Sequence, residues 1–372
     1  MFFVNNAGYH QFRKIGMSKV YFIPASEDEG RERVTAKVRT LVEKAGLESR
    51  IGPKDLVALK IHFGEKGNTT HIPPEYVRPV VEAVKRKGGK PFLTDSNVLY
   101  RSERDNAVDH LVLAASHGFT VENIGAPVLI ADGLLGSAEK EVEIRGQLFQ
   151  KISVSATAAE AGAVVVLTHV TGHMNSGLGG AIKNLGMGFA SRKGKLQQHS
   201  TMKPSVSPKR CTGCQVCIRW CPADAIAMAG PVALIDGNKC IGCGECITVC
   251  RFDAVKHDWR ASSMDLQKRM AEYALGMVSG HDGKIMGLNF VLSVTKDCDC
   301  LNGTQTPVIP DIGILCGEDP VALDAASLNV IEAKTGKKLM DLSYPEIDPW
   351  IQIRHGEAIG LGSSTYSLVE VS

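Results

Sequence analysis

Short apolar runs alternate with amphipathic stretches from Val20 to about Ala190. The apolar runs are rich in residues that favour strands. Regular alternation of strands and helices is typical of an α/β layer built on a mostly parallel sheet. The pattern predicts strands at 20–24, 56–63, 91–95, 127–131 and 163–169, with helices at about 29–46, 74–87 and 104–117.

The rest of the chain extends this pattern and makes the sheet mixed. Residues 139–155 alternate in the manner of an antiparallel hairpin around Gly146. Later in the chain, Asp319 and Pro320 suit the N-cap and the first turn of a helix. The expected elements there are a helix near 263–278, strands near 286–294 and 312–316, and a helix from Asp319 to about Ala333. We therefore predict an α/β fold whose mostly parallel or mixed sheet has flanking helices.

The α/β pattern stands on both sides of a cysteine-rich segment, which predicts an insertion rather than a terminal fusion. Ser191 to Arg210 contains six Lys or Arg residues, no acids and two prolines, and it predicts a linker. The alternative is a basic patch for an acidic redox partner or an anionic substrate. The predicted parts are a flexible leader at 1–16 with Met17 as the natural start, a discontinuous α/β domain at 17–200 and 260–372, and an inserted domain at 201–259.

Composition narrows the class of protein. The chain has 372 residues, of which 44% are hydrophobic and 22% charged, as in ordinary globular proteins. Lys and Arg number 42 against 40 Asp and Glu, so the net charge of +2 gives no reason to expect nucleic acid or an anionic membrane as a partner. No apolar run is long enough to cross a bilayer, and the first residues lack the apolar core of a signal peptide. A cytoplasmic location is expected.

The strongest chemical signal is a duplicated cysteine motif. Each copy has the spacing C-x2-C-x2-C-x3-C, and Pro222 follows the first copy, as in the run with which bacterial ferredoxins hold iron–sulfur clusters. In two-cluster ferredoxins the fourth cysteine of each run serves the other cluster. The motif therefore predicts one [4Fe–4S] cluster on Cys211, Cys214, Cys217 and Cys250, and a second on Cys240, Cys243, Cys246 and Cys221.

Two other interpretations of these cysteines exist. Zinc sites prefer two CxxC pairs brought together rather than a compact run of four. A disulfide framework is typical of short secreted chains, whereas this chain is long and lacks a secretory signal. Both are therefore less consistent with the sequence than two clusters.

Polar residues follow several predicted strands at their carboxyl ends, where open α/β sheets bind ligands. His169 and His173 are spaced to chelate a metal or to bracket a substrate, although one buried and one exposed structural histidine is the alternative. The nearby glycines lack the dinucleotide fingerprint, but N–H groups of a helix near 179–185 would suit an oxyanion. The candidate catalytic residues are His62, Asp95, His169, His173, Lys183, His199, Cys298 and Cys300.

The remaining cysteines have different expected roles. Cys298 and Cys300 would lie on one side of an extended strand, and their acidic neighbours would raise both thiol pKa values. Their spacing is too tight for an unstrained disulfide and suits a metal, shared with His169 and His173, a thiol redox step or a substrate-facing turn. The alternative is two small packed residues. Cys316 fits a buried hydrophobic position, and Asp311 is expected in the pocket.

These motifs together resemble the DUF362 family of iron–sulfur proteins with an inserted bacterial-type ferredoxin unit. The resemblance runs from about Met17 to residue 360, and it rests on the runs 168–173, 179–188, 198–200 and 298–300, the cysteine repeat, and the runs 311–315 and 319–324. It implies an α/β domain associated with two [4Fe–4S] clusters, typical of anaerobic bacteria and archaea, and it implies no substrate. Arg251 stands where a second proline would follow Cys250, which leaves the ligands unaffected.

Three functions are consistent with this sequence. The first is an oxidoreductase, in which clusters near about −400 mV exchange electrons with a site in the α/β domain. The second is a non-enzymatic ferredoxin-like carrier, and the third is a metal-handling or cluster-handling maturation protein. The expected partner is a redox protein or a small-molecule electron donor or acceptor. The first and third hypotheses also allow an additional metal or a flavin.

Overall fold

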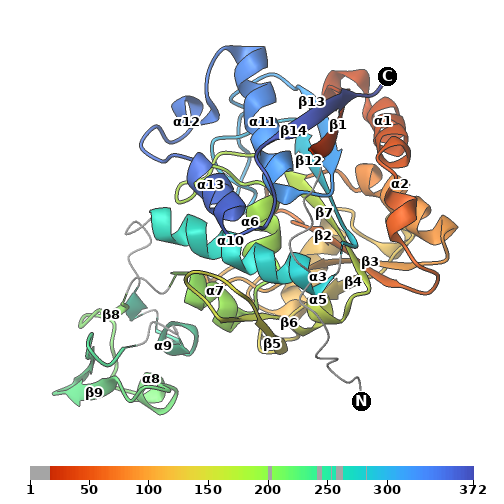
Figure 1. The fold of residues 1–372 in the computed structure, drawn as a ribbon. Helices are drawn as coiled ribbons and strands as arrows, with labels where there is room; N and C mark the ends of the chain where they lie inside the picture. Colours follow the sequence, from red (N-terminus) through yellow and green to blue (C-terminus); the bar gives the residue numbers. More distant parts are fainter. Residues whose placement is uncertain (1–16, 200–202, 241–244, 253, 257–262, 282) are drawn as a thin grey trace.

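An eight-stranded mixed sheet forms the centre of the computed structural model, which describes residues 17–199, 203–240, 245–252, 254–256, 263–281 and 283–372 (Figure 1). The strand order is β14-β1-β13-β12-β7-β2-β3-β4. Strand β13 runs antiparallel to both of its neighbours, and the other pairings in this sheet are parallel. The strands are β1 Ser18–Pro24, β2 Leu56–Ile61, β3 Lys90–Asp95, β4 Val128–Ile130, β7 Ala163–His169, β12 Ile285–Val291, β13 Gly313–Gly317 and β14 Tyr366–Glu370.

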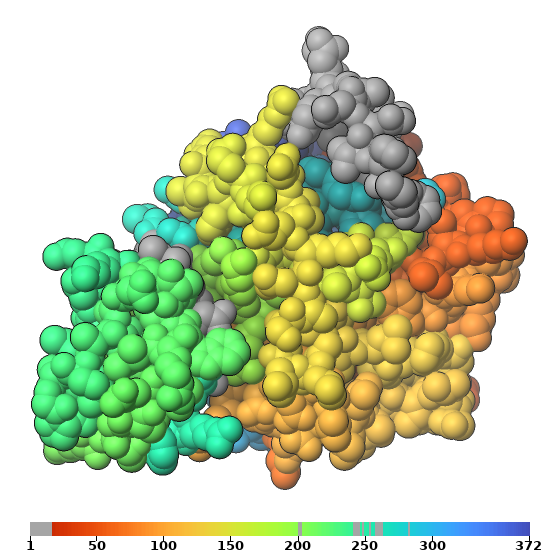
Figure 2. All heavy atoms as spheres, turned by 90° about the horizontal axis from the view of Figure 1, so that it is seen from below, coloured from red at the N-terminus to blue at the C-terminus, as the bar shows by residue number. Residues whose placement is uncertain are grey.

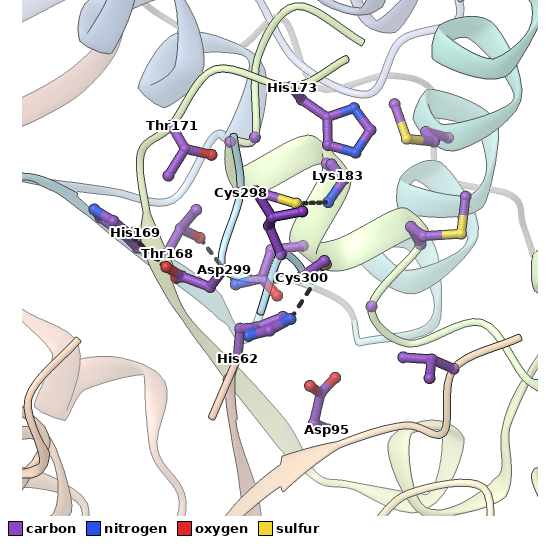
Figure 3. Close-up of a pocket in the computed structure, with 18 of the residues that line it drawn as sticks. His62, Asp95, Thr168, His169, Thr171, His173, Lys183, Cys298, Asp299 and Cys300 are labelled. Atoms are coloured by element: carbon purple, nitrogen blue, oxygen red, sulfur yellow. Dashed lines mark hydrogen bonds and ion pairs between the residues drawn. The ribbon is translucent and has the colours of Figure 1, made fainter. Parts of the chain in front are cut away.

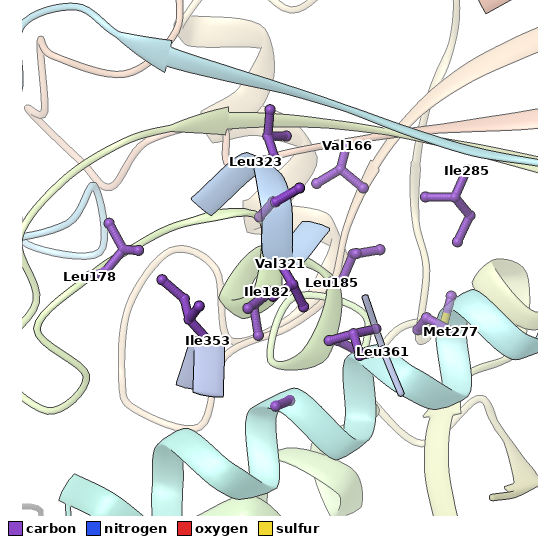
Figure 4. Packing of buried hydrophobic residues seen from close by; sticks show 14 of the residues in the cluster. Val166, Leu178, Ile182, Leu185, Met277, Ile285, Val321, Leu323, Ile353 and Leu361 are labelled. Carbon is purple, nitrogen blue, oxygen red and sulfur yellow. The ribbon is translucent and has the colours of Figure 1, made fainter. Parts of the chain in front are cut away.

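Helices cover both faces of this sheet because its central strands are apolar on both sides. All seven residues of β7 are buried, and alternate residues of this strand join two different hydrophobic clusters. Helices α1 Arg31–Lys44 and α2 Pro74–Arg86 pack in one cluster. Helices α6 Ala181–Gly186, α10 Ser263–Gly280, α11 Pro320–Thr335 and α13 Trp350–Ala358 pack in the other, part of which is drawn in Figure 4.

The predicted α/β class and mixed sheet are confirmed. Residues 139–155 form the antiparallel hairpin of β5 Glu139–Glu143 and β6 Lys151–Ser155. Asp319 caps α11, since its carboxylate accepts hydrogen bonds from the backbone N–H groups of Val321 and Ala322. The other elements are η1 Glu27–Glu29, η2 Leu47–Arg50, α3 Ala107–Ser116, α4 Val121–Ile124, α5 Ala156–Glu160 and α12 Leu339–Leu342.

The linker predicted from Ser191 to Arg210 is wrong over much of its length. Residues Arg192–His199 form helix α7. Within α7, Lys195, Leu196 and Gln198 are buried, so this basic segment belongs to the body of the protein. The number of basic residues suggested an exposed linker because it does not distinguish an exposed lysine from a buried one such as Lys195.

The cysteine-rich segment forms a small module between α7 and α10. Its strands pair only with one another among the described residues, β9 with β10 and β8 with β11. Figure 2 shows the module as a green lobe beside the main body. Its elements are β8 Ser205–Val206, α8 Val216–Arg219, β9 Ile226–Ala229, β10 Val232–Ile235, α9 Glu245–Thr248 and β11 Val255–Lys256.

None of the described helices is both long and apolar enough to cross a membrane.

Candidate functional site

A cavity of about 430 Å³ opens at the carboxyl ends of β2, β3, β7 and β12. These strands run parallel, so the residues that follow them meet at one edge of the sheet (Figure 3). The turn that carries Cys298 and Cys300 follows β12, and α6 brings Lys183 next to this turn. The cavity is lined by all eight candidate residues, His62, Asp95, His169, His173, Lys183, His199, Cys298 and Cys300.

The floor of the cavity holds a buried ion network around Asp95. Its carboxylate lies 2.8 Å from the Lys60 ammonium and 3.0 Å from the Arg104 guanidinium. Burial alone would raise the pKa of Asp95, but Lys60 and Arg104 hold that pKa well below its usual range. Burial also lowers the pKa of Lys60, against the opposing effect of Asp95. The Glu65 carboxylate lies 3.8 Å from the Arg104 guanidinium, so the two cations of this network face two carboxylates.

Lys60 and Arg104 are site residues that the sequence reasoning missed. Lys60 stands inside the apolar run of β2 and is only 1% exposed. A charged residue within a buried strand was the signal available, because such a residue needs a partner. Arg104 had no comparable signal, since it precedes helix α3 in an irregular segment.

His169 is fully engaged with groups of the protein. Its Nδ1 lies 3.0 Å from both carboxylate oxygens of Asp299, and its Nε2 lies 3.0 Å from the carbonyl oxygen of Leu292. Burial alone would lower the pKa of His169, but Asp299 raises it above its ordinary value. His169 therefore anchors the turn of Cys298 and Cys300 through Asp299, and both of its nitrogens are committed.

His173 and Lys183 form another wall. The Nδ1 atom of His173 accepts hydrogen bonds of 3.1 Å from the backbone N–H groups of Asn175 and Ser176. Burial, followed by the charge of Lys183, lowers the pKa of His173 to about 3, so the ring is neutral with its proton on Nε2. The Lys183 ammonium lies 3.9 Å from Sγ of Cys298. This wall is cationic without a carboxylate partner for Lys183 among the described contacts.

The two thiols of the cavity are chemically unequal. Sγ of Cys300 lies 3.3 Å from Nε2 of His62. The hydrogen bond from Cys298, followed by His62 and Lys183, holds the pKa of Cys300 well below its usual range against the effect of burial. The same hydrogen bond and burial raise the pKa of Cys298. Cys300 is therefore the more acidic thiol of the pair.

Two expectations for this segment are wrong. Residues 298–300 form a turn and not an extended strand. The acidic neighbours do not raise both thiol pKa values, because Asp299 binds His169 and Asp297 accepts a hydrogen bond from the Tyr344 hydroxyl. Both carboxylates are thus occupied elsewhere, and Cys300 responds instead to His62 and Lys183.

Two further expectations are corrected by internal contacts. The N–H groups that open α6 do not await an oxyanion, since Asp324 accepts hydrogen bonds from Ala181 at 2.7 Å and from Ile182 at 2.9 Å. Asp311 is not among the residues that line the cavity, and its carboxylate accepts hydrogen bonds from Glu27 and Ser293. In contrast, Cys316 is fully buried as expected.

Among the described residues, no group of three or more His, Cys, Asp or Glu side chains is arranged to hold a metal ion. In the cavity, both ring nitrogens of His169 already hydrogen-bond to groups of the protein.

In the small module, cysteines of both runs come together. One small cavity is lined by Cys211, Cys214, Cys217 and Cys250. Backbone N–H groups point at three of the sulfurs of the module, from Ala254 to Cys250 at 3.3 Å, from Ala225 to Cys221 at 3.2 Å and from Ala233 to Cys211 at 3.5 Å. The ten described cysteines of the chain are free thiols, and Cys243 lies outside the described residues.

The chain matches the family model described as Domain of unknown function (DUF362) over residues 57–329. It belongs to the DUF362 family. The match takes in the strands and turns that build the cavity, together with the cysteine module. No curated protein matches this DUF362 chain.

Two solved structures are similar to this DUF362 protein at low identity. The lactate racemase apoprotein from Thermoanaerobacterium thermosaccharolyticum is 12% identical with a TM-score of 0.43, over 82% of this chain and 55% of that one. A protein from Thermotoga maritima is 10% identical with a TM-score of 0.40, over 82% of this chain and 59% of that one. The chain thus covers less than two thirds of either structure.

Proposed function

We propose that this DUF362 protein is an iron–sulfur oxidoreductase, in which the small module carries two [4Fe–4S] clusters and the α/β body holds a small-molecule substrate in the cavity. The observation that carries the proposal is a contact between the two parts. The Arg101 guanidinium donates a 2.7 Å hydrogen bond to the carbonyl oxygen of Arg251. Arg251 follows Cys250, and Arg101 follows Tyr100, which lines the cavity. The predicted redox group and the cavity thus meet through adjacent residues.

The donor set of the module fits an iron–sulfur cluster. Cys250 comes from the second run and yet shares a cavity with Cys211, Cys214 and Cys217, which is the exchange of fourth ligands expected for two clusters. Backbone N–H groups directed at cysteine sulfurs are the contacts that adjust cluster potentials. A cubane also holds its cysteines further apart than a single ion does, so the absence of a single-ion site among the described residues does not conflict with it. When bound, the clusters would supply electrons one at a time at low potential.

The body of the protein contributes the binding site. Lys60, Asp95 and Arg104 hold one wall rigid, and His169 fixes the turn that presents the thiols. Lys183 and Cys300 both line the cavity, so a substrate there would meet a cation and an acidic thiol. A carrier that only docks partners would not need such a cavity. Electrons would come from a redox protein or a small-molecule donor.

Metal analysis tests this proposal. Protein purified without oxygen should contain about eight irons and eight acid-labile sulfides per chain, as two [4Fe–4S] clusters require. The Cys250→Ser variant should lose up to half of the iron, whereas Cys316→Ala should retain it, because Cys316 lies in the core of the main sheet. Stoichiometric zinc in place of iron, or no metal, would refute the proposal.

A further inference from the structure

The geometry points to a second reactive group, and we propose that Cys298 and Cys300 form a catalytic dithiol that exchanges with a small organic disulfide bound in the cavity. This inference rests on the proposed function only for the source of its electrons. It names a substrate class, organic disulfides, and it assigns separate roles to the two thiols. Both cysteines are partly exposed and line the cavity, so a ligand can reach them.

The turn that carries the thiols is held from several sides. Asp299 lies between the two cysteines, and its carboxylate is fixed by His169 at 3.0 Å. Its carbonyl oxygen accepts a 3.0 Å hydrogen bond from the backbone N–H group of Glu65. The backbone N–H group of Leu301 closes the turn on the carbonyl oxygen of Cys298 at 3.0 Å. These contacts hold both sulfur atoms at the cavity wall before a ligand arrives, as a preorganised site requires.

The surroundings distinguish an attacking thiol from a resolving one. Cys300 lies 3.3 Å from Nε2 of His62 and has the lowered pKa, so it is the thiol that ionises first. The thiolate is the nucleophile in disulfide exchange. Cys298 has the raised pKa and keeps its proton, and the Lys183 ammonium 3.9 Å from its Sγ stabilises the anion that it becomes later. A two-cysteine exchange reaction needs these two roles, one thiol that attacks the substrate and one that resolves the mixed disulfide.

The reaction balances with these two residues. The Cys300 thiolate attacks one sulfur of the substrate, R–S–S–R′, which forms a mixed disulfide on Cys300 and releases R′–S⁻. Cys298 then loses its proton and attacks Sγ of Cys300, which forms the Cys298–Cys300 disulfide and releases R–S⁻. The proton of Cys298 and one proton from solvent convert the two released thiolates to thiols. Two electrons from a donor and one proton then restore the Cys300 thiolate and the Cys298 thiol.

The single residue between Cys298 and Cys300 favours a disulfide that is easily reduced again. A disulfide that departs from relaxed geometry is more easily reduced, and strained, accessible disulfides are the labile and catalytic ones. Closing a ring across a single intervening residue is such a case, so the oxidised pair accepts electrons readily. The cavity of about 430 Å³ lies within the range of small-molecule sites, and Val98, Leu99, Leu266 and Met270 give it an apolar wall.

Trapping experiments on the whole protein test the dithiol. Anaerobic, prereduced protein is freed of reductant, incubated with 2-hydroxyethyl disulfide, alkylated and digested for mass spectrometry. We expect a Cys298–Cys300 disulfide in the unaltered protein and in the Cys316→Ala control. Cys298→Ser should accumulate the mixed disulfide on Cys300. Cys300→Ser should form adducts on Cys298 more slowly, because burial still raises the pKa of the Cys298 thiol and His62 contacts Cys300 instead. His62→Asn should move the midpoint of the pH dependence of Cys300 alkylation upward by about one pH unit if one pKa unit of activation is lost.

The same samples separate this inference from the proposed function. Each variant is checked for iron, for sulfide and for its thermal midpoint, so a misfolded protein is recognised and replaced by the corresponding alanine variant. Two reduced, adduct-free thiols in iron-loaded protein would overturn the dithiol and leave the clusters standing. A Cys298–Cys300 disulfide in iron-free protein would leave the dithiol standing and remove its proposed electron source. Zinc that copurifies with the protein and is lost in Cys298→Ser would also overturn the dithiol.

Discussion

The Asp95→Asn substitution should destabilise the main body strongly. Asp95 is 2% exposed, and its carboxylate is the shared partner of the Lys60 ammonium and the Arg104 guanidinium. The amide of asparagine keeps the shape and removes the negative charge, which leaves the Lys60 ammonium without its carboxylate partner and leaves Arg104 with only the Glu65 carboxylate, 3.8 Å away. Removing one partner of a buried ion pair costs about 3–5 kcal/mol.

Proton loss from Lys60 sets an upper limit on the stability that Asp95→Asn can cost. Lys60 can escape the uncompensated charge by releasing its proton, and at pH 7 this costs an amine with an ordinary pKa near 10.4 about 4.6 kcal/mol. The pKa of Lys60 is already lowered by burial, so the limit is below this figure. We therefore expect a loss of about 3–4 kcal/mol, which lies at the lower end of the range for broken buried pairs.

Thermal unfolding followed by far-UV circular dichroism measures this loss. A body of roughly 300 residues has an unfolding entropy of about 0.6 kcal/mol/K, so the midpoint should fall by about 5–7 °C. The double variant Lys60→Met/Asp95→Asn is the matched control, and it should cost less than the sum of the single changes because it removes both charges together. A midpoint shift of less than about 1 °C in Asp95→Asn, or strict additivity in the double variant, would refute the buried network as we describe it.

Two further substitutions test other parts of the site. The His169 pKa is raised and the Asp299 pKa is lowered, so their pair stabilises the fold fully between about pH 4 and pH 6.5 and loses this contribution as the pH rises through the raised pKa of the histidine. The thermal advantage of the unaltered protein over His169→Gln should therefore narrow from pH 6 to pH 9, and an advantage that grows with pH would contradict the ion pair. In Gly180→Ala, the new Cβ would lie 2.5 Å from the carboxylate of Asp324, so denaturant unfolding should show a loss of about 1–3 kcal/mol. Gly280→Ala is its control, since a Cβ there meets nothing within 4 Å and stability should change little; equal losses in both variants would exclude the Asp324 contact as the cause.

The sequence predicted the central strands because strands buried on both faces form clear apolar runs, whereas the half-exposed edge strand β14 was not predicted. It also identified residues that converge on one cavity, since parallel strands place their carboxyl ends together. It failed where function depends on partners that are distant in sequence. Asp324 lies far along the chain from the α6 N-terminus that it caps, and no local pattern announces such a contact.

The thiol pair illustrates the same limit in its chemistry. Acidic neighbours in sequence suggested two raised pKa values, yet the side chains of Asp297 and Asp299 bind Tyr344 and His169 instead. The pKa of Cys300 is lowered first by the hydrogen bond from Cys298 and then by His62, which follows β2, and by Lys183 of α6, which only the fold brings to the turn. The sequence therefore predicted which residues line the cavity. It did not predict their pKa values, because those values depend on tertiary contacts.

The most direct test of the central claim is low-temperature electron paramagnetic resonance of protein purified without oxygen and reduced stepwise with dithionite. We predict the signals of two reduced [4Fe–4S] clusters that interact magnetically, with bleaching of the visible absorbance and about eight irons per chain. In Cys250→Ser, one set of signals should be altered or lost, and the interaction should disappear. A protein that shows no cluster signal and no bleaching on reduction, although it is folded and was never exposed to oxygen, would contradict the account.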